Sequence, residues 1–305
     1  MSTTPENIEE VQYLELIRDI LANGTLESGR NGKTFSVFGR TMRFSLADGR
    51  LPILTTKQMA WKTCAKELFW FLSGSTDNAV LQKQGVRIWD GNASREFLDS
   101  RGLTEYAENE LGPVYGHQWR RFGAPYTPRS RQTTPEIPTK KEEGIDQIQQ
   151  IIDTLRDPAQ RSSRRILLSA WNPLQLDEMA LPPCHVLAQF HVREGKYLSC
   201  ALFQRSCDVG LGVPFNILSY SLLTHLLAKH TGLVADEFVY FMGNAHIYEE
   251  HRESLEIQCQ RVPFEFPHIH IASDPKPSIE DYTLEDIQFQ TPYRHHPTIV
   301  MRMKA

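Results

Sequence analysis

The segment that most constrains the fold runs over residues 181–216. Apolar and polar residues alternate through its middle, which is typical of a β-hairpin with one buried face. Several polar residues then crowd the end of the second strand: Gln204, Arg205, Ser206, Asp208 and Asn216. Because a buried polar group is costly unless it has a partner, this cluster predicts a ligand with an anionic end and hydrogen-bonding edges. The rest of the chain is expected to supply the scaffold and the other half of a pocket.

The composition is that of an ordinary globular protein. The chain has 305 residues, of which 40% are hydrophobic and 23% charged, enough for one large domain or two small ones. Its net charge of -4 argues against a general electrostatic attraction to nucleic acid or acidic membranes, but is compatible with a local basic pocket. No stretch of about 20 residues is continuously apolar, and the N-terminus has no basic patch followed by an apolar core. We therefore expect neither a membrane span nor a secretory signal.

Cysteine and histidine spacing bears on compartment and metal binding. The chain has five cysteines, an odd number without a CxxC pair, which favours free thiols in a reducing compartment. We expect a cytoplasmic protein, with the nucleus as an alternative. His246 and His251 are five positions apart, not the four that put two ligands on one helical face, and the other histidine pairs lack nearby cysteine or carboxylate ligands. No metal site is expected.

Periodicity and helix-ending residues predict the order of the elements. Helices are expected over residues 9–22, 57–73, 144–157 and 214–230, with another ending near residue 260. Strands are expected over residues 35–44, 161–171 and 236–242, in addition to the hairpin. Residues 85–90 are predicted to be a short strand or a turn, and residues 111–119 an irregular aromatic segment. Residues 124–143, rich in proline and charge, are predicted to be a surface insertion within one domain.

Two side chains are candidates for catalysis from the residue pattern alone. Cys184 follows two prolines that fix the backbone, and Arg205 is expected alongside it, where a guanidinium would lower the pKa of the thiol. His185 is adjacent to Cys184, but neighbouring side chains diverge on an extended chain, so a Cys–His dyad is not favoured. Glu67 directly precedes a run of large apolar residues. It lies either on a solvated edge or inside, as a proton-transferring carboxyl with a raised pKa.

Three further features have both a structural and a functional interpretation. The glycine-containing loop with Arg30 and Lys33 is either a surface turn or a loop that binds an anion. Arg164 and Arg165 either end a strand in solvent or reach a phosphate across a subunit interface. Trp89 is either a core residue or a stacking surface.

Six motifs, read along the chain, resemble the thymidylate synthase family. They are ELFWFLSGST, LGPVYGHQW, SRRILLSAWNP, LPPCH, FQRSCDVGLGVPFN and GNAHIY. The resemblance extends from Tyr13 to the C-terminus, and the insertion and the ending PTIVMRMKA are similar to the eukaryotic and eukaryotic-virus branch. It implies an α/β (α+β) fold over residues 1–305: one large domain with a twisted mixed β-sheet flanked by helices, forming a homodimer through a sheet face. We expect no dihydrofolate reductase domain.

The resemblance also implies a methyltransferase reaction. In the family, the cysteine that matches Cys184 adds to carbon 6 of the uracil of dUMP, and carbon 5 then attacks the methylene group of 5,10-methylenetetrahydrofolate. Hydride transfer from the folate yields dTMP and dihydrofolate, so the folate is both carbon donor and reductant. Glu67, Tyr115 and His185 match residues of a water network that moves protons, and Asp208 is expected to act in catalysis as well.

Binding roles are implied for the matching positions. The implied dUMP contacts, from phosphate to base, are Arg30, Arg164, Arg165, Arg205, Ser206, His246, Tyr248 and Asn216. Arg164 and Arg165 would come from the partner subunit, so the resemblance implies active sites shared across the dimer. The implied folate contacts are Lys57, Ile88, Trp89, Asp208 and Ala305. The amide of Asn216 suits the edge of uracil, because cytosine presents the opposite donor and acceptor pattern.

Four departures from the family pattern define the alternatives. The Arg30 loop is one residue short, Gln58 replaces a common arginine, Asn244 a common aspartate, and Ala305 a larger apolar last residue. Because the tail excludes water from the ligands, the change at Ala305 leaves a dUMP hydroxymethylase as one alternative. The other is a non-catalytic regulator that binds nucleotides or RNA, since family members bind RNA. The intact Cys184 argues against it.

Overall fold

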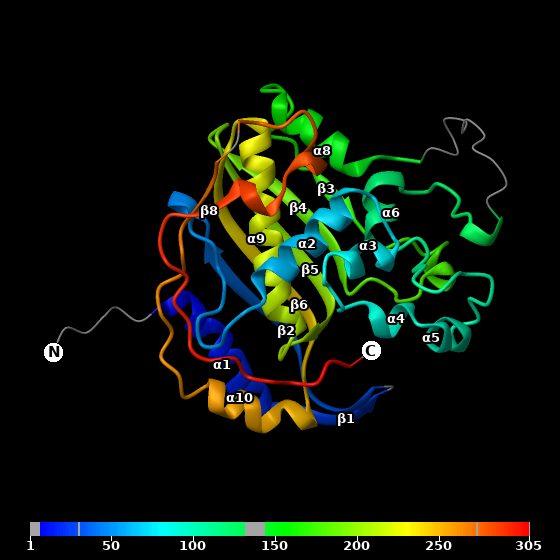
Figure 1. The fold of residues 1–305 in the computed structure, drawn as a ribbon. Coiled ribbons are helices and arrows are strands. Elements are labelled where there is room, and N and C mark those ends of the chain that lie inside the picture. Colours follow the sequence, from blue (N-terminus) through cyan, green and yellow to red (C-terminus); the bar gives the residue numbers. More distant parts are fainter. Residues whose placement is uncertain (1–6, 30, 132–143, 273, 305) are drawn as a thin grey trace.

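The sheet at the centre of the protein is built from segments that alternate apolar and polar residues. The computed structural model describes residues 7–29, 31–131, 144–272 and 274–304. Within them, six strands pair in the order β1-β2-β6-β5-β4-β3 (Figure 1). Their bounds are β1 Thr25–Gly29, β2 Gly32–Ser45, β3 Leu167–Ser169, β4 His185–Arg193, β5 Tyr197–Asp208 and β6 Val234–Tyr248. Only β5 and β6 pair in parallel, so the predicted mixed sheet is confirmed.

The predicted hairpin is formed by β4 and β5. Glu194 and Gly195 connect them with φ angles of 55° and 66°. Two successive positive φ angles give the turn whose twist matches that of the flanking strands. The N–H of Lys196 donates to the C=O of Arg193 at 3.1 Å and closes the turn. The register that follows places the polar end of β5 beside the start of β4.

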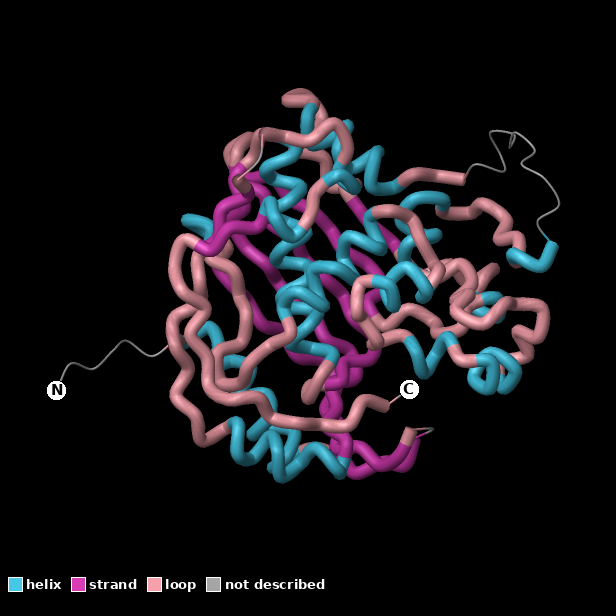
Figure 2. The backbone as a smooth tube through the Cα atoms, viewed as in Figure 1, coloured by secondary structure: helices cyan, strands magenta, loops and turns pink. Residues whose placement is uncertain are grey.

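Helices cover one face of the sheet. α9 (Gly212–Thr231) packs across β5 and β6, and α2 (Trp61–Leu72) and α8 (Gln147–Arg156) pack against α9. α6 (Tyr115–Arg121) packs against α2, and Figure 2 shows these helices in front of the strands. α9 is apolar around most of its circumference because it is enclosed on nearly all sides, and Gly232 ends it with a φ of 73°.

The remaining helices and strands lie around this core. They are α1 (Ile8–Asn23), α3 (Asn78–Lys83), α4 (Asp90–Ala93), α5 (Arg95–Ser100), α10 (Arg252–Gln258), and the paired β7 (Ile269–Ile271) and β8 (Ile287–Phe289). α1 packs against β2 and β6, with α10 beside it. No helix in the described ranges combines the length and the apolarity that a membrane crossing requires.

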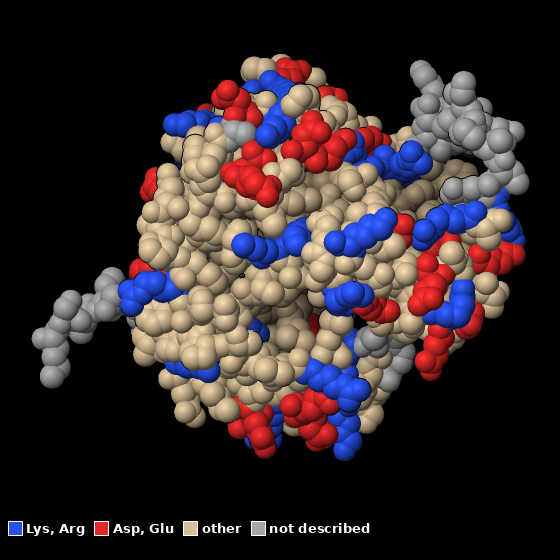
Figure 3. All heavy atoms as spheres, viewed as in Figure 1, with Lys and Arg blue, Asp and Glu red and all other residues tan. Residues whose placement is uncertain are grey.

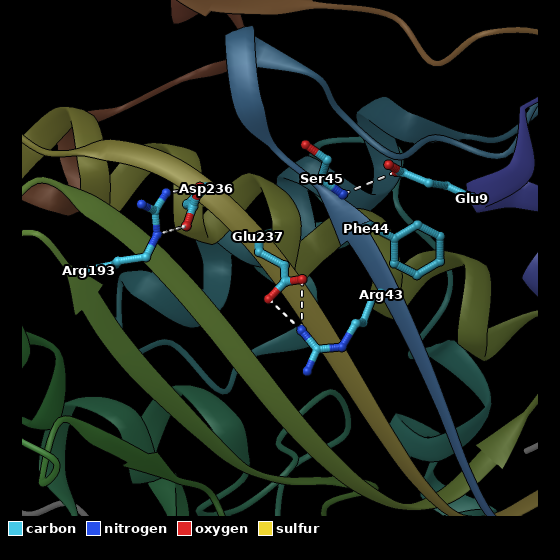
Figure 4. A pocket seen from close by; sticks show the side chains of 7 residues that line it. All are labelled: Glu9, Arg43, Phe44, Ser45, Arg193, Asp236 and Glu237. Carbon is cyan, nitrogen blue, oxygen red and sulfur yellow. Dashed lines mark hydrogen bonds and ion pairs between the residues drawn. The ribbon is translucent and has the colours of Figure 1, made fainter.

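The other face of the sheet carries exposed apolar side chains. Leu187, Phe203 and Phe241 are in register across β4, β5 and β6, and the two phenylalanines are 45% and 44% exposed. Ion pairs line a hollow at one end of this face (Figure 4): Arg43–Glu237 and Arg193–Asp236. No helix of the described residues covers this row, which therefore stays partly exposed in the single chain.

The helix predicted from residue 57 begins only at Trp61. The backbone before it bends at residues 55–57 and is held there by Tyr293, whose hydroxyl accepts from the N–H of Met59 at 3.0 Å and donates to the C=O of Leu54 at 2.7 Å. A long-range contact therefore overrides the local preference for helix.

Four other predicted helix or strand boundaries also differ from those in the structure. Residues 111–119 are not wholly irregular, because α6 begins at Tyr115. The strand predicted over residues 236–242 continues to Tyr248, since β2 and β5 pair with it on both sides. The basic loop after residue 26 is largely a strand pair, β1–β2, and the strand predicted over residues 161–171 is reduced to β3. Residues 85–89 form a turn that leads into α4 at Asp90, and residues 132–143 of the predicted insertion lie outside the described residues.

Candidate active site

Cys184 stands immediately before β4. Its N–H donates to the hydroxyl of Tyr115 at 2.8 Å, and its C=O accepts from the N–H of Arg205 at 2.9 Å. The Arg205 guanidinium donates to the carbonyls of Pro183 and Pro182 at 2.8 and 2.9 Å. Arg205 thus lies alongside the cysteine segment, as expected. Cys184 is half-buried, whereas three of the other cysteines are fully buried.

α2 directs Glu67 inward. The Nε1 of Trp89 donates to the Oε1 of Glu67 at 2.7 Å. Burial raises the pKa of Glu67 to about 7, and the hydrogen bond from Trp89 opposes this shift. A carboxyl with a pKa near neutrality can release and take back a proton at working pH. Of the two positions left open by the sequence, the inward one is observed: Glu67 is half-buried and hydrogen-bonded to Trp89, so the solvated edge is wrong.

Tyr115 and His185 form a stacked pair. Their ring centroids are 3.9 Å apart and the planes are inclined by 8°. The Nδ1 of His185 shares a hydrogen bond with the hydroxyl of Tyr220 at 2.7 Å. Burial lowers the pKa of His185 to about 3, so its imidazole is neutral. A neutral imidazole does not supply the cation of a Cys–His ion pair.

Lys57 and Asp208 meet at the turn between β5 and α9. The Nζ of Lys57 donates to the C=O of Gly210 at 2.6 Å, and the N–H of Gly210 donates to Oδ1 of Asp208 at 2.9 Å. Burial lowers the pKa of Lys57 to about 8, against the opposing charges of two nearby carboxylates. A Cβ on Gly212 would lie 3.6 Å from the side chain of Asp208 and 3.8 Å from that of Asn216. The turn therefore gathers a carboxylate, an ammonium group and an amide.

Parallel pairing of β5 and β6 brings a second group of predicted residues to the same end of the sheet. Ser206 lies opposite Asn244, and Asp208 lies opposite His246. The Nδ1 of His246 hydrogen-bonds to the Oδ1 of Asn244 at 2.9 Å, and the ring of Tyr248 stands 5.5 Å away at 88° to the imidazole. Burial lowers the pKa of His246. Asn244, a departure from the family pattern, thus orients the imidazole.

The C-terminal tail runs past α10 towards the β5–α9 turn (Figure 1). The Nε2 of His251 hydrogen-bonds to the C=O of Arg302 at 2.8 Å. A Cβ on Gly210 would lie 2.9 Å from Nδ1 of His251 and 3.3 Å from Sδ of Met301. The tail therefore rests on the turn at a point where only glycine fits without displacement.

The charges around the site suit an anionic ligand. In Figure 3, Lys and Arg side chains form a band across the face that carries α2 and α3, and the surface is hollowed beneath it. Among the residues that the structure describes, no group of three or more His, Cys, Asp or Glu side chains could hold a metal ion. A thiol beside a guanidinium and a carboxyl that titrates near neutrality are suited to nucleophilic addition with proton transfer.

A family model described as thymidylate synthase matches residues 11–305. The chain belongs to the thymidylate synthase family. It is 51% identical over 301 residues to the bifunctional dihydrofolate reductase-thymidylate synthase of Leishmania amazonensis. The aligned region is 98% of this chain and 56% of that protein. The chain is 50% identical over 298 residues to thymidylate synthase 1/2 of Encephalitozoon cuniculi, with 97% of each covered. It is 48% identical over 296 residues to the thymidylate synthase of human herpesvirus 8, covering 97% and 84%. The chain spans little more than half the length of the bifunctional relatives that it matches.

Two arginines that the family pattern assigns to the phosphate are not gathered with the others. Arg164 and Arg165 are exposed, and the C=O of Arg164 accepts from Nε2 of Gln189 at 3.0 Å, on the uncovered side of the sheet. Arg205 binds the carbonyls of Pro182 and Pro183 just before β4, whereas Arg164 is bonded to Gln189, farther along that strand.

Three other positions that the family pattern assigns to ligand binding are Arg30, Ile88 and Ala305. Arg30 and Ala305 lie outside the described residues. Ile88 is half-buried, next to Trp89, which is itself a buried core residue as well as the partner of Glu67.

Several supporting residues of the site were missed by sequence reasoning. The Arg205 guanidinium lies over the ring of Trp171, 5.4 Å from its centroid. Gln204 accepts from the hydroxyl of Tyr240 at 2.6 Å and donates to the C=O of Ser206 at 2.9 Å. The only sequence signal for the role of Tyr240 is its position inside an apolar strand, because a buried hydroxyl requires a hydrogen-bond partner.

Proposed function

We propose that the protein is a methyltransferase that converts dUMP to dTMP with 5,10-methylenetetrahydrofolate and releases dihydrofolate. The supporting observation is the placement of Cys184 beside Arg205 and its connection, through Tyr115 and Trp89, to the inward-facing Glu67. Tyr115 links the two parts, since its hydroxyl binds the Cys184 N–H and its ring packs 6.2 Å from that of Trp89. The thiolate favoured by the guanidinium would add to carbon 6 of the uracil ring. Glu67, with a pKa near neutrality, would exchange protons with the base through the network that includes Tyr115 and His185.

The nucleotide is proposed to lie along the ends of β5 and β6. Arg205 and Ser206 would bind its phosphate, together with Arg30 and the arginines of the partner subunit described below. Asn216 would pair with the base, since an amide both donates and accepts as the uracil edge requires. His246 and Tyr248 would hold the sugar hydroxyl.

The residues at the β5–α9 turn fit a folate. Asp208 accepts the N–H of Gly210, and a carboxylate has further lone pairs for the N–H donors of a pterin ring. Lys57, Ile88 and Trp89 would add positive charge and apolar surface, with Ala305 closing the site. When bound, the folate supplies the one-carbon unit and the hydride. The contact of the tail with Gly210 supports a role of the tail in excluding water.

We also propose a homodimer with shared active sites. The row Leu187, Phe203 and Phe241 offers an apolar surface on the side of the sheet without α9. A second copy seated there would bring its Arg164 and Arg165 towards the phosphate. The whole chain would then be one catalytic domain with a surface insertion around residues 124–143. The odd number of cysteines, without a CxxC pair, suits a cytoplasmic location.

A turnover assay tests the proposed reaction. Dihydrofolate absorbance should rise when the protein meets dUMP and the methylene folate. The Cys184→Ala variant should still bind dUMP but lose turnover, whereas Cys259→Ala, a substitution at a half-buried cysteine under α1, should keep it. Consumption of dUMP without dihydrofolate would indicate hydroxymethylation, and turnover by Cys184→Ala would remove the cysteine as nucleophile.

Mixing two inactive variants tests the shared site. Cys184→Ala and Arg165→Ala should each be inactive or strongly impaired. A mixed dimer has one site that carries both substitutions and one that carries neither, so exchange of subunits should restore part of the activity. A mixture no more active than its components would contradict the sharing of Arg165.

A further inference from the structure

The carboxyl group of Glu10 is one of the most enclosed charges in the described residues, with an exposed fraction of 0%. It lies in the first turn of α1 and accepts hydrogen bonds from two successive residues. The N–H and hydroxyl of Thr55 donate to it at 2.9 and 2.6 Å, and those of Thr56 at 2.8 and 2.7 Å. No lysine or arginine forms an ion pair with it in the part of the chain that the structure describes.

The hydrogen bonds of the two threonines indicate that Glu10 is ionised. The hydroxyl of Thr55 already accepts from the N–H of Phe264 at 2.8 Å, and that of Thr56 accepts from Nε2 of Gln258 at 2.8 Å. Each hydroxyl proton is therefore available to Glu10, which receives four donors. Burial raises the pKa of Glu10, and these donors oppose the shift. A buried anion compensated only by neutral groups is expensive for a structural anchor alone.

The segment that Glu10 holds leads directly to Lys57. Its ammonium group donates to the Gly210 carbonyl at 2.6 Å, in the turn that carries Asp208. The other hydrogen bonds of residues 55–57 involve neutral partners or the backbone of the segment. For example, Arg261 donates to the C=O of Thr56 at 2.7 Å. Asp208 and Glu10 are the two anions that favour the charged form of Lys57 against its burial.

We propose that Glu10 is a positioning residue for the folate half of the active site. Its carboxylate fixes Thr55 and Thr56 so that the Lys57 ammonium stays against the Gly210 carbonyl beside Asp208. Glu10 touches neither substrate and acts through Lys57. The inference rests on the proposed function, because that function makes the β5–α9 turn the folate site.

Loss of the Glu10 charge should change the pH dependence of kcat/KM for the folate. Removing the negative charge of Glu10 withdraws one of the two interactions that favour the ammonium form, so the pKa of Lys57 falls below about 8. Lys57 then loses its proton at a lower pH. The alkaline limb of kcat/KM for the folate should move to lower pH with it, with Asp208 still in place.

The test is Glu10→Gln in the full chain, with Glu110→Gln as matched control. Glu110 is also buried and accepts from the N–H groups of Ala107 and Arg129 and the hydroxyl of Tyr126, all at 2.9 Å. It lies away from the β5–α9 turn. Glu10→Gln should raise the KM for the folate about ten-fold, the effect of one lost charged hydrogen bond, and leave the dissociation constant for dUMP within about two-fold. Glu110→Gln should change neither the folate KM nor its pH profile.

A second pair of variants covers the case in which Glu10→Gln does not fold. Thr56→Val removes one donor to the carboxylate and should raise the folate KM in the same direction, whereas Thr56→Ser keeps the hydroxyl and should not. Lower thermal stability of Glu10→Gln and Thr56→Val with unchanged folate KM and pH profile would overturn the inference and leave Glu10 as a structural residue. A wild-type protein without turnover would remove the proposed function and this inference together; wild-type turnover with an unchanged Glu10→Gln variant would remove the inference alone.

Discussion

At the scale of single residues, Trp89 controls how the carboxyl of Glu67 titrates. Its indole N–H donates at 2.7 Å and stabilises the carboxylate, whereas burial favours the neutral acid. Trp89→Phe removes the donor and keeps an apolar ring, so the pKa of Glu67 should rise above about 7. The limb of the kcat profile that reports Glu67 should move to higher pH. Trp70→Phe, which changes a ring 6.1 Å from Trp89 whose N–H binds Asp77 instead, is the control and should leave that limb in place.

The raised pKa of Glu67 also links stability to pH. The folded protein retains this proton up to about pH 7, whereas the unfolded chain releases it near pH 4.5. The favourable contribution is therefore fully present below pH 4.5 and is lost as the pH rises through about 7. Glu67→Gln, which cannot ionise, should gain stability relative to wild type between pH 5 and 8, by up to about 3 kcal/mol. Urea unfolding of both proteins at pH 5 and at pH 8 measures this gain in stability. A stability difference between them that does not change with pH would contradict the raised pKa of Glu67.

At the scale of elements, the β5–α9 turn supports the C-terminal tail. Gly210→Ala places a Cβ 2.9 Å from His251 and 3.3 Å from Met301, so His251, which binds the C=O of Arg302 in the tail, must shift. We expect a loss of about 1–3 kcal/mol from the tail contact and a higher folate KM. Faster removal of the tail by carboxypeptidase would report the displacement. Gly212→Ala is the matched control, because its Cβ would meet nothing closer than 3.6 Å. Equal digestion of both variants would argue against the contact.

Arg120 ties α6 to its neighbours. It pairs with Asp146 at 2.9 Å and Glu280 at 3.1 Å, and donates to the C=O of Leu72 at the end of α2 at 2.5 Å. Arg120→Met leaves these acceptors without their cation, so it should lower the free energy of unfolding by about 3 kcal/mol. Arg121→Met, at the adjacent exposed position, should change it by less than about 0.5 kcal/mol. Urea denaturation compares them, and similar losses would show that Arg120 acts only as a surface charge.

Elements with a strong local pattern were predictable, and elements fixed by distant contacts were not. The β4–β5 hairpin follows from alternation, and α8 and α9 from helical periodicity and their ends. By contrast, α2 starts late because Tyr293, far along the chain, holds the segment before it. The same distinction applies to the site. Cys184 and Arg205 were foreseeable because one hairpin joins them, but the enclosure of Glu67 depends on Trp89 from a separate turn.

At the scale of the whole molecule, the uncovered face of the sheet is the surface proposed for the dimer. Phe241 is 44% exposed in the single chain and lies beside Phe203 in register. Phe241→Asp places a charge in this apolar row and should shift the protein from dimer to monomer in sedimentation experiments, with loss of activity. Ile257→Asp is the control, since that side chain is 54% exposed on α10. An unchanged dimer in both variants would place the interface elsewhere.

The parallel pairing of β5 and β6 groups the site in an unusual way along the chain. The stretch of residues 197–248 contains β5, α9 and β6 in succession, and both strands end at the same edge of the sheet. The phosphate, base and sugar contacts proposed for one subunit's nucleotide fall almost entirely within this stretch, whereas Cys184 and Glu67 lie before it. A recombination event between two relatives that exchanges this stretch would transfer recognition of the nucleotide as a block. Cys184 and Glu67 would stay with the recipient, whereas Asp208 would travel with the stretch, so the nucleophile and nucleotide recognition can be inherited separately.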